Sequence, residues 1–244
     1  MTNRAKSSHI GSCLSIADIL AVLYGEVLNV RPNEPDWEDR DRFILSKDHA
    51  CAVVYAVLAE CGFFPVEQLE TFYQNGSLLS GHISHHVAGV EASTGSLGHG
   101  LSIGCGMALA EKSRVFVLLS DGECDEGSTW EAVMFARQHK LDNLVAIVDY
   151  NKLQAMGETK NIIDLNPLVD KWYSFGWAVR EIDGNNIEHL KHILKYIPYE
   201  TGKPNCIIAH TVKGRGVSQM ENKTEWHYKY PDDEELKRAL EELR

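Results

Sequence analysis

Residues 115–154, VFVLLSDGECDEGSTWEAVMFARQHKLDNLVAIVDYNKLQ, decide the fold. The segment contains two short apolar runs, VFVLLS (115–120) and LVAIVDY (144–150), with the composition of strands buried on both faces. Between them, TWEAVMFARQHK (129–140) repeats its apolar residues with the period of an amphipathic helix. A strand, a helix and a second strand in this order predict two parallel strands of one sheet.

The same alternation continues on both sides of this segment. Further strands are predicted at 42–45, 177–183 and 206–212, and further helices at 15–28, 49–61, 186–197 and 233–244. Ser15 and Asp18 have the spacing of a capping box at the start of the first of these helices. No repeat, low-complexity linker or Pro/Gly-rich break divides the chain, so residues 1–244 are predicted to form a single α/β domain whose parallel sheet has helices on both faces.

Composition and charge exclude several classes of protein. With 44% hydrophobic and 24% charged residues, the chain has the balance of an ordinary globular protein. Its 24 Lys and Arg against 35 Asp and Glu give a net charge of −11, which argues against nucleic-acid and membrane-surface partners. No apolar run approaches the roughly 20 residues of a membrane span, and the N-terminus has no signal-peptide core. The six cysteines form no C-x-x-C pair, which favours reduced thiols in the cytoplasm over a zinc site.

Polar residues follow the two strands of the opening segment at the point where each strand ends. Asp121 and Gly122 come directly after residues 115–120, and Asn151 follows residues 144–150. Because ligands of parallel sheets bind beyond the carboxyl ends of the strands, these side chains are expected to meet in one crevice. A lone Asp-Gly is more often a turn, but the matched positions on consecutive strands favour a site for Mg²⁺ or Ca²⁺. A backbone carbonyl, water and phosphate oxygens would complete its coordination.

A glycine-rich segment, EASTGSLGHGLSIGCGMALA (91–110), runs from a turn into a helix. Gly95 and Gly98 there, together with Gly100, can leave backbone N–H groups open to a phosphate or a flat ring. Gly104 and Gly106 are predicted to serve close packing of the helix.

The eleven histidines include His9 before the first predicted helix, His49 after the strand at 42–45, His82 in the loop at 80–86 and His227 after the basic loop at 211–216. Loop histidines near strand ends are candidates for general acid–base catalysis, because their pKa lies near working pH. By contrast, the histidines on amphipathic helices, His139, His189 and His192, are predicted to be solvated. Lys213 and Arg215 either contact a phosphate or belong to a solvated loop.

Several blocks of this sequence resemble, in order and over nearly the whole chain, the N-terminal diphosphate-binding domain of transketolases. The blocks are LSIADILAVLY, DRFILSKDHA, GVEASTGSLGHGLSIGCGMALA, SDGECDEGSTWEA, DYNKLQ and TVKGRGVSQMENKTEWH. The Asp-Gly followed about thirty residues later by Asn-Lys-Leu is similar to the thiamin-diphosphate signature of that superfamily. The resemblance implies a doubly wound α/β domain that binds the Mg²⁺–diphosphate end of thiamin diphosphate.

The resemblance also implies roles for individual residues. The metal ligands would be Asp121, Asn151 and the carbonyl of Leu153. The remaining cofactor contacts would be Gly95, Ser96 and Leu97 near the rings, Gly122 and His227 near the diphosphate, Lys213 nearby, and Glu123. On the substrate side, the matching residues are His9, His49 and His82. Glu126 matches a glutamate at the dimer interface that helps to couple two active sites.

Full-length transketolases continue into a pyrimidine-binding domain and a C-terminal domain, to which this chain has no match. The resemblance therefore implies the N-terminal subunit of a split transketolase, with those domains on a partner chain in a heterotetramer of two copies of each chain. Its reaction would transfer a two-carbon ketol unit between sugars or sugar phosphates. Two alternatives stay open: a subunit of a 2-oxo acid decarboxylating enzyme, against which the histidine set argues, and a non-catalytic paralogue.

The sequence departs from the family pattern at a few positions. Asp48 stands where glycine is usual, Ser120 replaces the glycine before Asp-Gly, His99 replaces a glutamine, Tyr228 follows His227 where glycine is common, and Ser8-His9-Ile10 replaces Gly-His-Pro. An acid beside His49 is expected to raise the pKa of that histidine or to disfavour an anionic donor.

Overall fold

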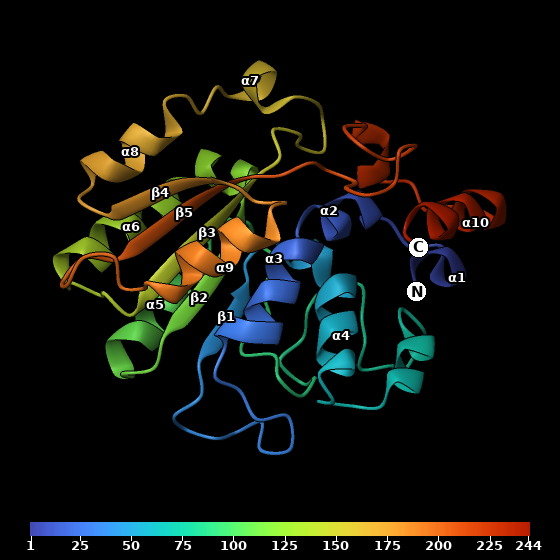
Figure 1. The fold of residues 1–244 in the computed structure, drawn as a ribbon, viewed down its shortest axis with the longest axis horizontal. Helices are drawn as coiled ribbons and strands as arrows, with labels where there is room; N and C mark the ends of the chain where they lie inside the picture. Colours follow the sequence, from blue (N-terminus) through green and yellow to red (C-terminus); the bar gives the residue numbers. More distant parts are fainter.

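The computed structural model describes all 244 residues and contains one five-stranded sheet (Figure 1). Its strands are β1 (Arg42–Leu45), β2 (Val115–Ser120), β3 (Leu144–Tyr150), β4 (Ala178–Asp183) and β5 (Asn205–His210). They lie in the order β1-β2-β3-β5-β4, and every neighbouring pair is parallel. The predicted parallel α/β sheet is confirmed. None of the helices has the length and apolar character required to cross a bilayer.

Helices cover both faces of the sheet (Figure 1). One face carries α2 (Ile10–Ser15), α3 (Ala17–Val22), α4 (Cys51–Glu60) and α9 (Ile187–Lys195), and the other carries α5 (Gly100–Ala110), α6 (Gly127–Gln138) and α8 (Leu168–Ser174). The remaining elements are α1 (Thr2–Ala5), α7 (Thr159–Ile162), α10 (Asp233–Glu242), the π-helical turn η1 (Leu23–Val27) and the 3₁₀ turns η2 (Asp48–Ala50), η3 (Val66–Thr71), η4 (Asp121–Asp125) and η5 (Thr224–His227).

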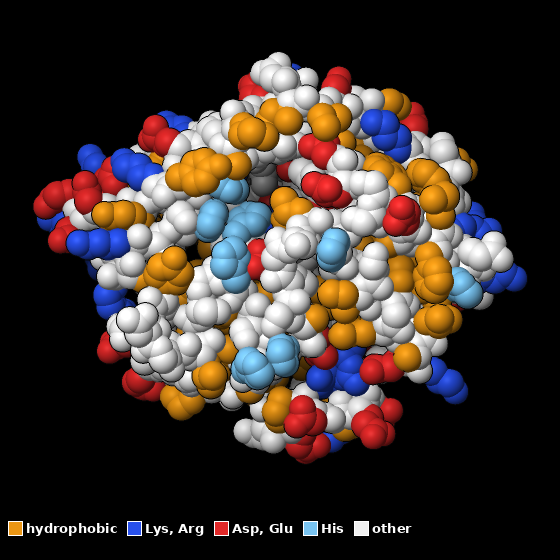
Figure 2. Space-filling view, turned by 180° about the vertical axis from the view of Figure 1, so that it is seen from behind, with side chains coloured by type: hydrophobic (Ala, Val, Ile, Leu, Met, Phe, Trp, Pro, Cys, Tyr) orange, Lys and Arg blue, Asp and Glu red, His pale blue; other side chains and the backbone are white.

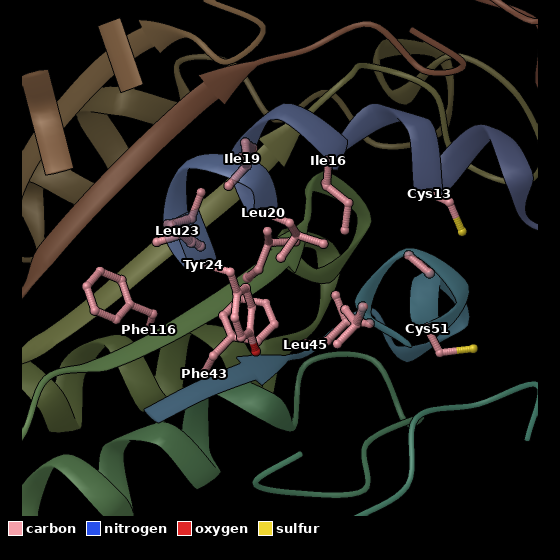
Figure 3. Close-up of a cluster of buried hydrophobic side chains, with 14 of the residues drawn as sticks. Cys13, Ile16, Ile19, Leu20, Leu23, Tyr24, Phe43, Leu45, Cys51 and Phe116 are labelled. Atoms are coloured by element: carbon pink, nitrogen blue, oxygen red, sulfur yellow. The ribbon is translucent and has the colours of Figure 1, made fainter. Parts of the chain in front are cut away.

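Alternate residues of the strands supply two hydrophobic cores, one for each face. Along β2, Phe116 and Leu118 pack into a cluster of 28 buried residues with α2, α3, α4 and α9. Val117 and Leu119 pack on the opposite face, with α5, α6 and α8. Figure 3 shows the first cluster, in which side chains of α3 and η1 lie over Phe43 and Phe116. Burying such a side chain contributes about 1.5–3 kcal/mol to folding.

Glycine lets α5 lie close to the sheet at one of the two predicted positions. A Cβ at Gly104 would collide with Val117 on β2, whereas one at Gly106 would meet no atom within 4 Å. The packing role is therefore confirmed for Gly104 and wrong for Gly106, which faces open space.

The predicted helix over 15–28 differs most from the structure. Helical structure already begins at Ile10, breaks at Ile16 and continues through α3 into η1. The capping box was a wrong interpretation, because Ser15 makes no cap hydrogen bond to α3 and instead donates its hydroxyl to Asp149 Oδ1 at 2.7 Å. Because the Ser15 hydroxyl is bound to the buried Asp149 carboxylate, it does not cap the helix.

The carboxyl ends of the strands position the candidate site. The segments that follow β1, β2 and β3 begin with Ser46, Asp121 and Asn151, respectively. All three strands are parallel neighbours, so their carboxyl ends share one edge of the sheet. Both chain ends lie together, with α1 beside α10 (Figure 1), where Asn3 Nδ2 donates to the carbonyl of Pro231 at 3.0 Å.

Candidate active site

A cleft of about 590 Å³ opens at the carboxyl ends of β1, β2 and β3. Figure 2 shows histidine side chains gathered beside a hollow in this face of the molecule. The predicted site residues that line the cleft are His9, His49, His82, Gly95, Leu97, Asp121, Gly122, Glu126, Asn151, Leu153, Lys213 and His227. Two predicted residues, Ser96 and Glu123, are not part of its lining. Residues from positions 9 to 227 thus converge on one cavity.

Asp121 is a buried carboxylate at the floor of this cleft, with only 2% of the residue exposed. Its Oδ1 accepts the N–H of Gly122 at 2.8 Å, and its Oδ2 accepts the N–H of Lys152 at 2.9 Å and the hydroxyl of Thr159 at 3.0 Å. Burial raises the pKa of Asp121 to about 6, and the nearby Asp149 carboxylate adds to the rise. Because it forms no ion pair with a basic side chain, its charge is one that a bound cation would stabilise.

The amide of Asn151 is held in one orientation. Its Nδ2 donates to Asp149 Oδ2 at 2.8 Å and to Ser15 Oγ at 3.2 Å. An ionised carboxylate only accepts hydrogen bonds, so the amide must present its NH₂ group to Asp149 and its oxygen to the other side. That oxygen accepts the N–H of Leu153 at 3.0 Å. An amide oxygen fixed in this way is a ready ligand for a hard cation.

A buried ion pair behind Asn151 provides this orientation, and no pattern in the sequence predicts that pair. Lys47 and Asp149 are 1% and 0% exposed and form a direct salt bridge. Burial opposes the ionisation of Asp149, but Lys47 and the hydroxyls of Thr211 and Ser15 outweigh it and lower its pKa. The one available signal was an acidic residue inside the otherwise apolar strand LVAIVDY. Removing one partner of such a pair costs about 3–5 kcal/mol.

The donor set fits a divalent cation that shares its shell with a diphosphate. No group of three or more His, Cys, Asp or Glu side chains is placed to hold a metal by itself. Asp121, Asn151 and the Leu153 carbonyl instead offer three oxygen ligands, which suits Mg²⁺ because it keeps water and phosphate oxygens in its shell. The Leu153 carbonyl accepts a hydrogen bond from Lys213 Nζ at 2.9 Å, which leaves its second lone pair for a metal.

Three histidines from distant segments face one another across the cleft. The ring centroids of His9, His49 and His227 are 5.0 Å (His9–His49), 4.9 Å (His9–His227) and 5.2 Å (His49–His227) apart. Burial, with repulsion from neighbouring cationic groups, lowers the pKa of His9 to about 4, that of His227 to about 3 and that of His49 well below its usual value. All three rings are therefore neutral near pH 7, so each offers one lone pair and one N–H.

Neighbouring side chains determine which ring nitrogen of His227 and of His9 stays free to contact a ligand. Lys213 Nζ lies 3.1 Å from His227 Nδ1, and since an ammonium only donates, the hydrogen of the neutral His227 ring is on Nε2. His9 Nδ1 lies 3.1 Å from Ser8 Oγ, which leaves its Nε2 as the unpaired nitrogen.

Asp48, which stands where the family usually has glycine, contacts the ring of His82, and not that of His49 as expected. Asp48 Oδ2 lies 2.5 Å from His82 Nδ1, and the pKa of His49 is lowered, not raised. The expectation that Asp48 raises the pKa of His49 was wrong, because burial and the nearby Lys47 determine that pKa while the carboxylate points toward the loop that carries His82.

Glu123 is turned into the protein, and its side chain makes no contact with the cleft. The carboxylate accepts hydrogen bonds from the N–H groups of Gly98 and Ser120, both at 2.9 Å, and from the Ser46 hydroxyl. Ser120, the second departure from the family pattern, forms a capping box with Glu123 at η4. We therefore correct the role of the Glu123 side chain from a cofactor contact to a brace between the glycine-rich segment and the loop after β2.

The low pKa values of these half-buried histidines predict how stability depends on pH. Because the folded-state pKa of His227 lies below its unfolded value near 6.5, the unfolded chain binds a proton that the folded chain excludes, and stability falls as pH decreases below about 6.5. Replacing His227 with glutamine is expected to make the loss of stability between about pH 7.5 and pH 5 less steep in urea titrations of the chain. The His139→Gln variant, on an exposed position, serves as the control. An unchanged slope for His227→Gln would contradict this prediction.

Comparison with known proteins agrees with this geometry. The family model described as "Transketolase, thiamine diphosphate binding domain" matches residues 1–243. The chain is 43% identical over 245 residues to an apulose-4-phosphate transketolase subunit of Phocaeicola vulgatus, covering 98% of this chain and 87% of that protein. It is 42% identical over 241 residues to a 6-deoxy-6-sulfo-D-fructose transketolase subunit of a Clostridium species, covering 96% of this chain and 88% of that protein.

Solved structures extend the similarity to the fold. The structure superposes on the transketolase of Leishmania mexicana with a TM-score of 0.94 and 30% sequence identity. That match covers 99% of this chain but only 39% of the other chain. The chain thus spans about two fifths of this larger protein, and nearly nine tenths of the two subunit relatives.

Proposed function

Because this chain belongs to the transketolase family, we propose that it is the diphosphate-binding subunit of a two-chain transketolase, transferring a two-carbon ketol unit from a ketose to an aldose. The observation that carries the proposal is the convergence of Asp121, Asn151 and the loop histidines on one cleft. The substrates that we propose are sugars or sugar phosphates, in line with the sugar names of the two subunit relatives.

The cofactor is thiamin diphosphate, for which the matched domain is named. We infer that Mg²⁺ is the metal, held by Asp121, Asn151 and the Leu153 carbonyl. The backbone at Gly122, with the side chains of Lys213 and His227, would contact the diphosphate, and Gly95, Ser96 and Leu97 would lie near the rings. When bound, the cofactor supplies the electron sink for cleavage of the carbon–carbon bond.

The histidines hold and move protons on the substrate side of the cleft. A neutral ring can accept a proton from a substrate hydroxyl, and the low pKa values of His9 and His49 keep these rings neutral at working pH. His9 would act through Nε2, the nitrogen that Ser8 leaves unpaired. Glu126 is exposed at the edge of the cleft, as its proposed role at an interface between subunits requires.

A second polypeptide would complete the active site. Subunit relatives of similar length support a partner, which we expect to carry the pyrimidine-binding and C-terminal domains in a heterotetramer with two copies of each chain. Apolar side chains on the rim of the cleft support this proposal: Leu97, Met156 and Ile163 are 37%, 78% and 53% exposed. The free state of all six cysteines supports a cytoplasmic location.

Two other functions receive less support. The histidines that line the cleft beside the candidate metal ligands favour a catalytic role over a non-catalytic paralogue. The same histidines, and the transketolase relatives, argue against a 2-oxo acid decarboxylating enzyme.

Replacing His82 with alanine tests the proposed function. In the assembled complex we expect kcat for ketol transfer to fall roughly 100-fold, because general acid–base catalysis contributes about 10²–10⁴-fold. The affinity for thiamin diphosphate should remain nearly unchanged, since His82 is not among the groups assigned to the diphosphate. The matched control is His139→Ala, on the exposed end of α6. Equal effects of the two variants would show that His82 has no part in the reaction.

A further inference from the structure

Asp48 and His82 form a pair on the wall of the cleft, joining the end of β1 to the loop at residues 80–82. The Asp48 side chain is 2% exposed, whereas that of His82 is 67% exposed, and the two are linked through Asp48 Oδ2 and His82 Nδ1 at 2.5 Å. Both residues line the cleft. The histidine ring is therefore held from the protein side through one nitrogen, and its other nitrogen, Nε2, is left without a partner in the protein.

The chemistry of the pair determines where the ring hydrogen lies. An ionised carboxylate only accepts hydrogen bonds, so the neutral His82 ring must carry its hydrogen on Nδ1 and its lone pair on Nε2. A carboxylate behind the ring also stabilises the imidazolium that forms when Nε2 takes up a proton.

We propose that Asp48 is a positioning residue for ketol transfer, which fixes the His82 ring so that the unprotonated Nε2 faces the hydroxyl groups of the substrate. This inference rests on the proposed function, in which His82 meets the substrate. Asp48 acts only through His82 and touches neither the cofactor nor the reacting atoms.

The surroundings of Asp48 support this role over a purely structural one. His82 is the only basic side chain in an ion pair with it, since the adjacent Lys47 is paired with Asp149. The same carboxylate oxygen also faces Gly95, where a Cβ would lie 3.2 Å from Asp48 Oδ2. Burial raises the pKa of Asp48, while the His82 ring and the backbone N–H of His49 oppose that rise.

The loop that carries His82 is anchored independently of Asp48. The carbonyl of His82 accepts hydrogen bonds from Tyr55 Oη at 3.0 Å and from Ser80 Oγ at 2.6 Å. Cys51 Sγ donates to the carbonyl of Gly81 at 3.2 Å. A substitution at Asp48 should consequently release the ring while the backbone of the loop keeps its place.

Nitrogen-resolved NMR of the histidine rings, combined with kinetics, tests the proposal. At about pH 8.5, where an ordinary histidine is neutral, we expect the parent chain to show His82 with its hydrogen on Nδ1. In Asp48→Gly the ring should shift toward the Nε2–H form that a free imidazole favours. The same shift is expected in Asp48→Asn, because its amide can donate to Nδ1. The His82 signals are identified by their loss in His82→Gln.

In the assembled complex, both Asp48 variants should lower kcat about tenfold or more, with KM within about twofold of the parent value. The matched control is Asp142→Asn. Asp142 lies just before the amino end of β3, where its carboxylate accepts the N–H of Gly202, and its replacement should leave the His82 tautomer and kcat unchanged.

A His82 tautomer that does not depend on residue 48, or an unchanged kcat in Asp48→Gly and Asp48→Asn, would overturn the proposal while the parent complex remains active. A parent complex that transfers no ketol unit would overturn the proposed function itself, together with the role of Asp48. The NMR result needs neither substrate nor partner, so the two failures are distinguishable.

Discussion

Replacing Asp121 with alanine is expected to lower Mg²⁺-dependent binding of thiamin diphosphate by about 100-fold or more. Asp121 is the only charged ligand among the three that this chain would offer to the metal, and the loss of an outer-shell partner alone typically costs 10–100-fold in metal affinity. Calorimetric titration of the cofactor into the assembled complex, with and without Mg²⁺, measures the effect. The matched control is Asp170→Ala, an exposed carboxylate on α8.

Asp121→Asn separates binding from folding. Asparagine removes the buried charge but keeps only one acceptor oxygen for the donors of Gly122, Lys152 and Thr159. These two effects on folding oppose each other, so the melting temperature of the metal-free chain is expected to change little while metal-dependent cofactor binding weakens. A destabilised fold would also weaken cofactor binding, but it would lower the melting temperature at the same time. Cofactor affinity that is unchanged in both Asp121 variants, or independent of Mg²⁺ in the parent, would contradict the assignment.

The strands and their carboxyl-end residues could be predicted because their signals are local. A run such as VFVLLS is apolar throughout because both faces of the sheet are covered, and the residue after such a strand must lie at the carboxyl edge. Asp121 and Asn151 were found in this way, and the structure brings both to the cleft.

The contacts that orient these residues could not be predicted, because they join positions far apart in the chain. Lys47 and Asp149 are 102 residues apart, and Ser15 and Asp149 are 134 apart. No periodicity encodes such pairs. The spacing of Ser15 and Asp18 instead suggested a local capping box, and the buried carboxylate of Asp149 overrode it.

The same limit applies to Asp48 and Glu123. The sequence showed an acid next to His49, but only the folded backbone directs that acid to His82, 34 residues away. Likewise, Glu123 follows the Asp-Gly motif closely, yet its side chain contacts Gly98 and Ser46 on other segments. Neighbours in sequence were a poor guide to side-chain direction at both positions.

Turnover is expected to require the partner subunit. The purified chain alone, saturated with thiamin diphosphate and Mg²⁺, is expected to show no ketol transfer. This chain would hold the diphosphate end of the cofactor, while the pyrimidine end and the remainder of the substrate site would require the other subunit. The exposed apolar rim at Leu97, Met156 and Ile163 should become protected from hydrogen exchange when that subunit binds.

Titration of this chain with the polypeptide that carries the pyrimidine-binding domain tests whether the two chains form the active site together. The rate of ketol transfer should rise from zero and level off at equal numbers of the two chains, with a mass in solution that corresponds to two copies of each. Full turnover by the 244-residue chain alone, or no turnover at any ratio of the two chains, would contradict the assignment of this chain as one subunit of a two-chain transketolase.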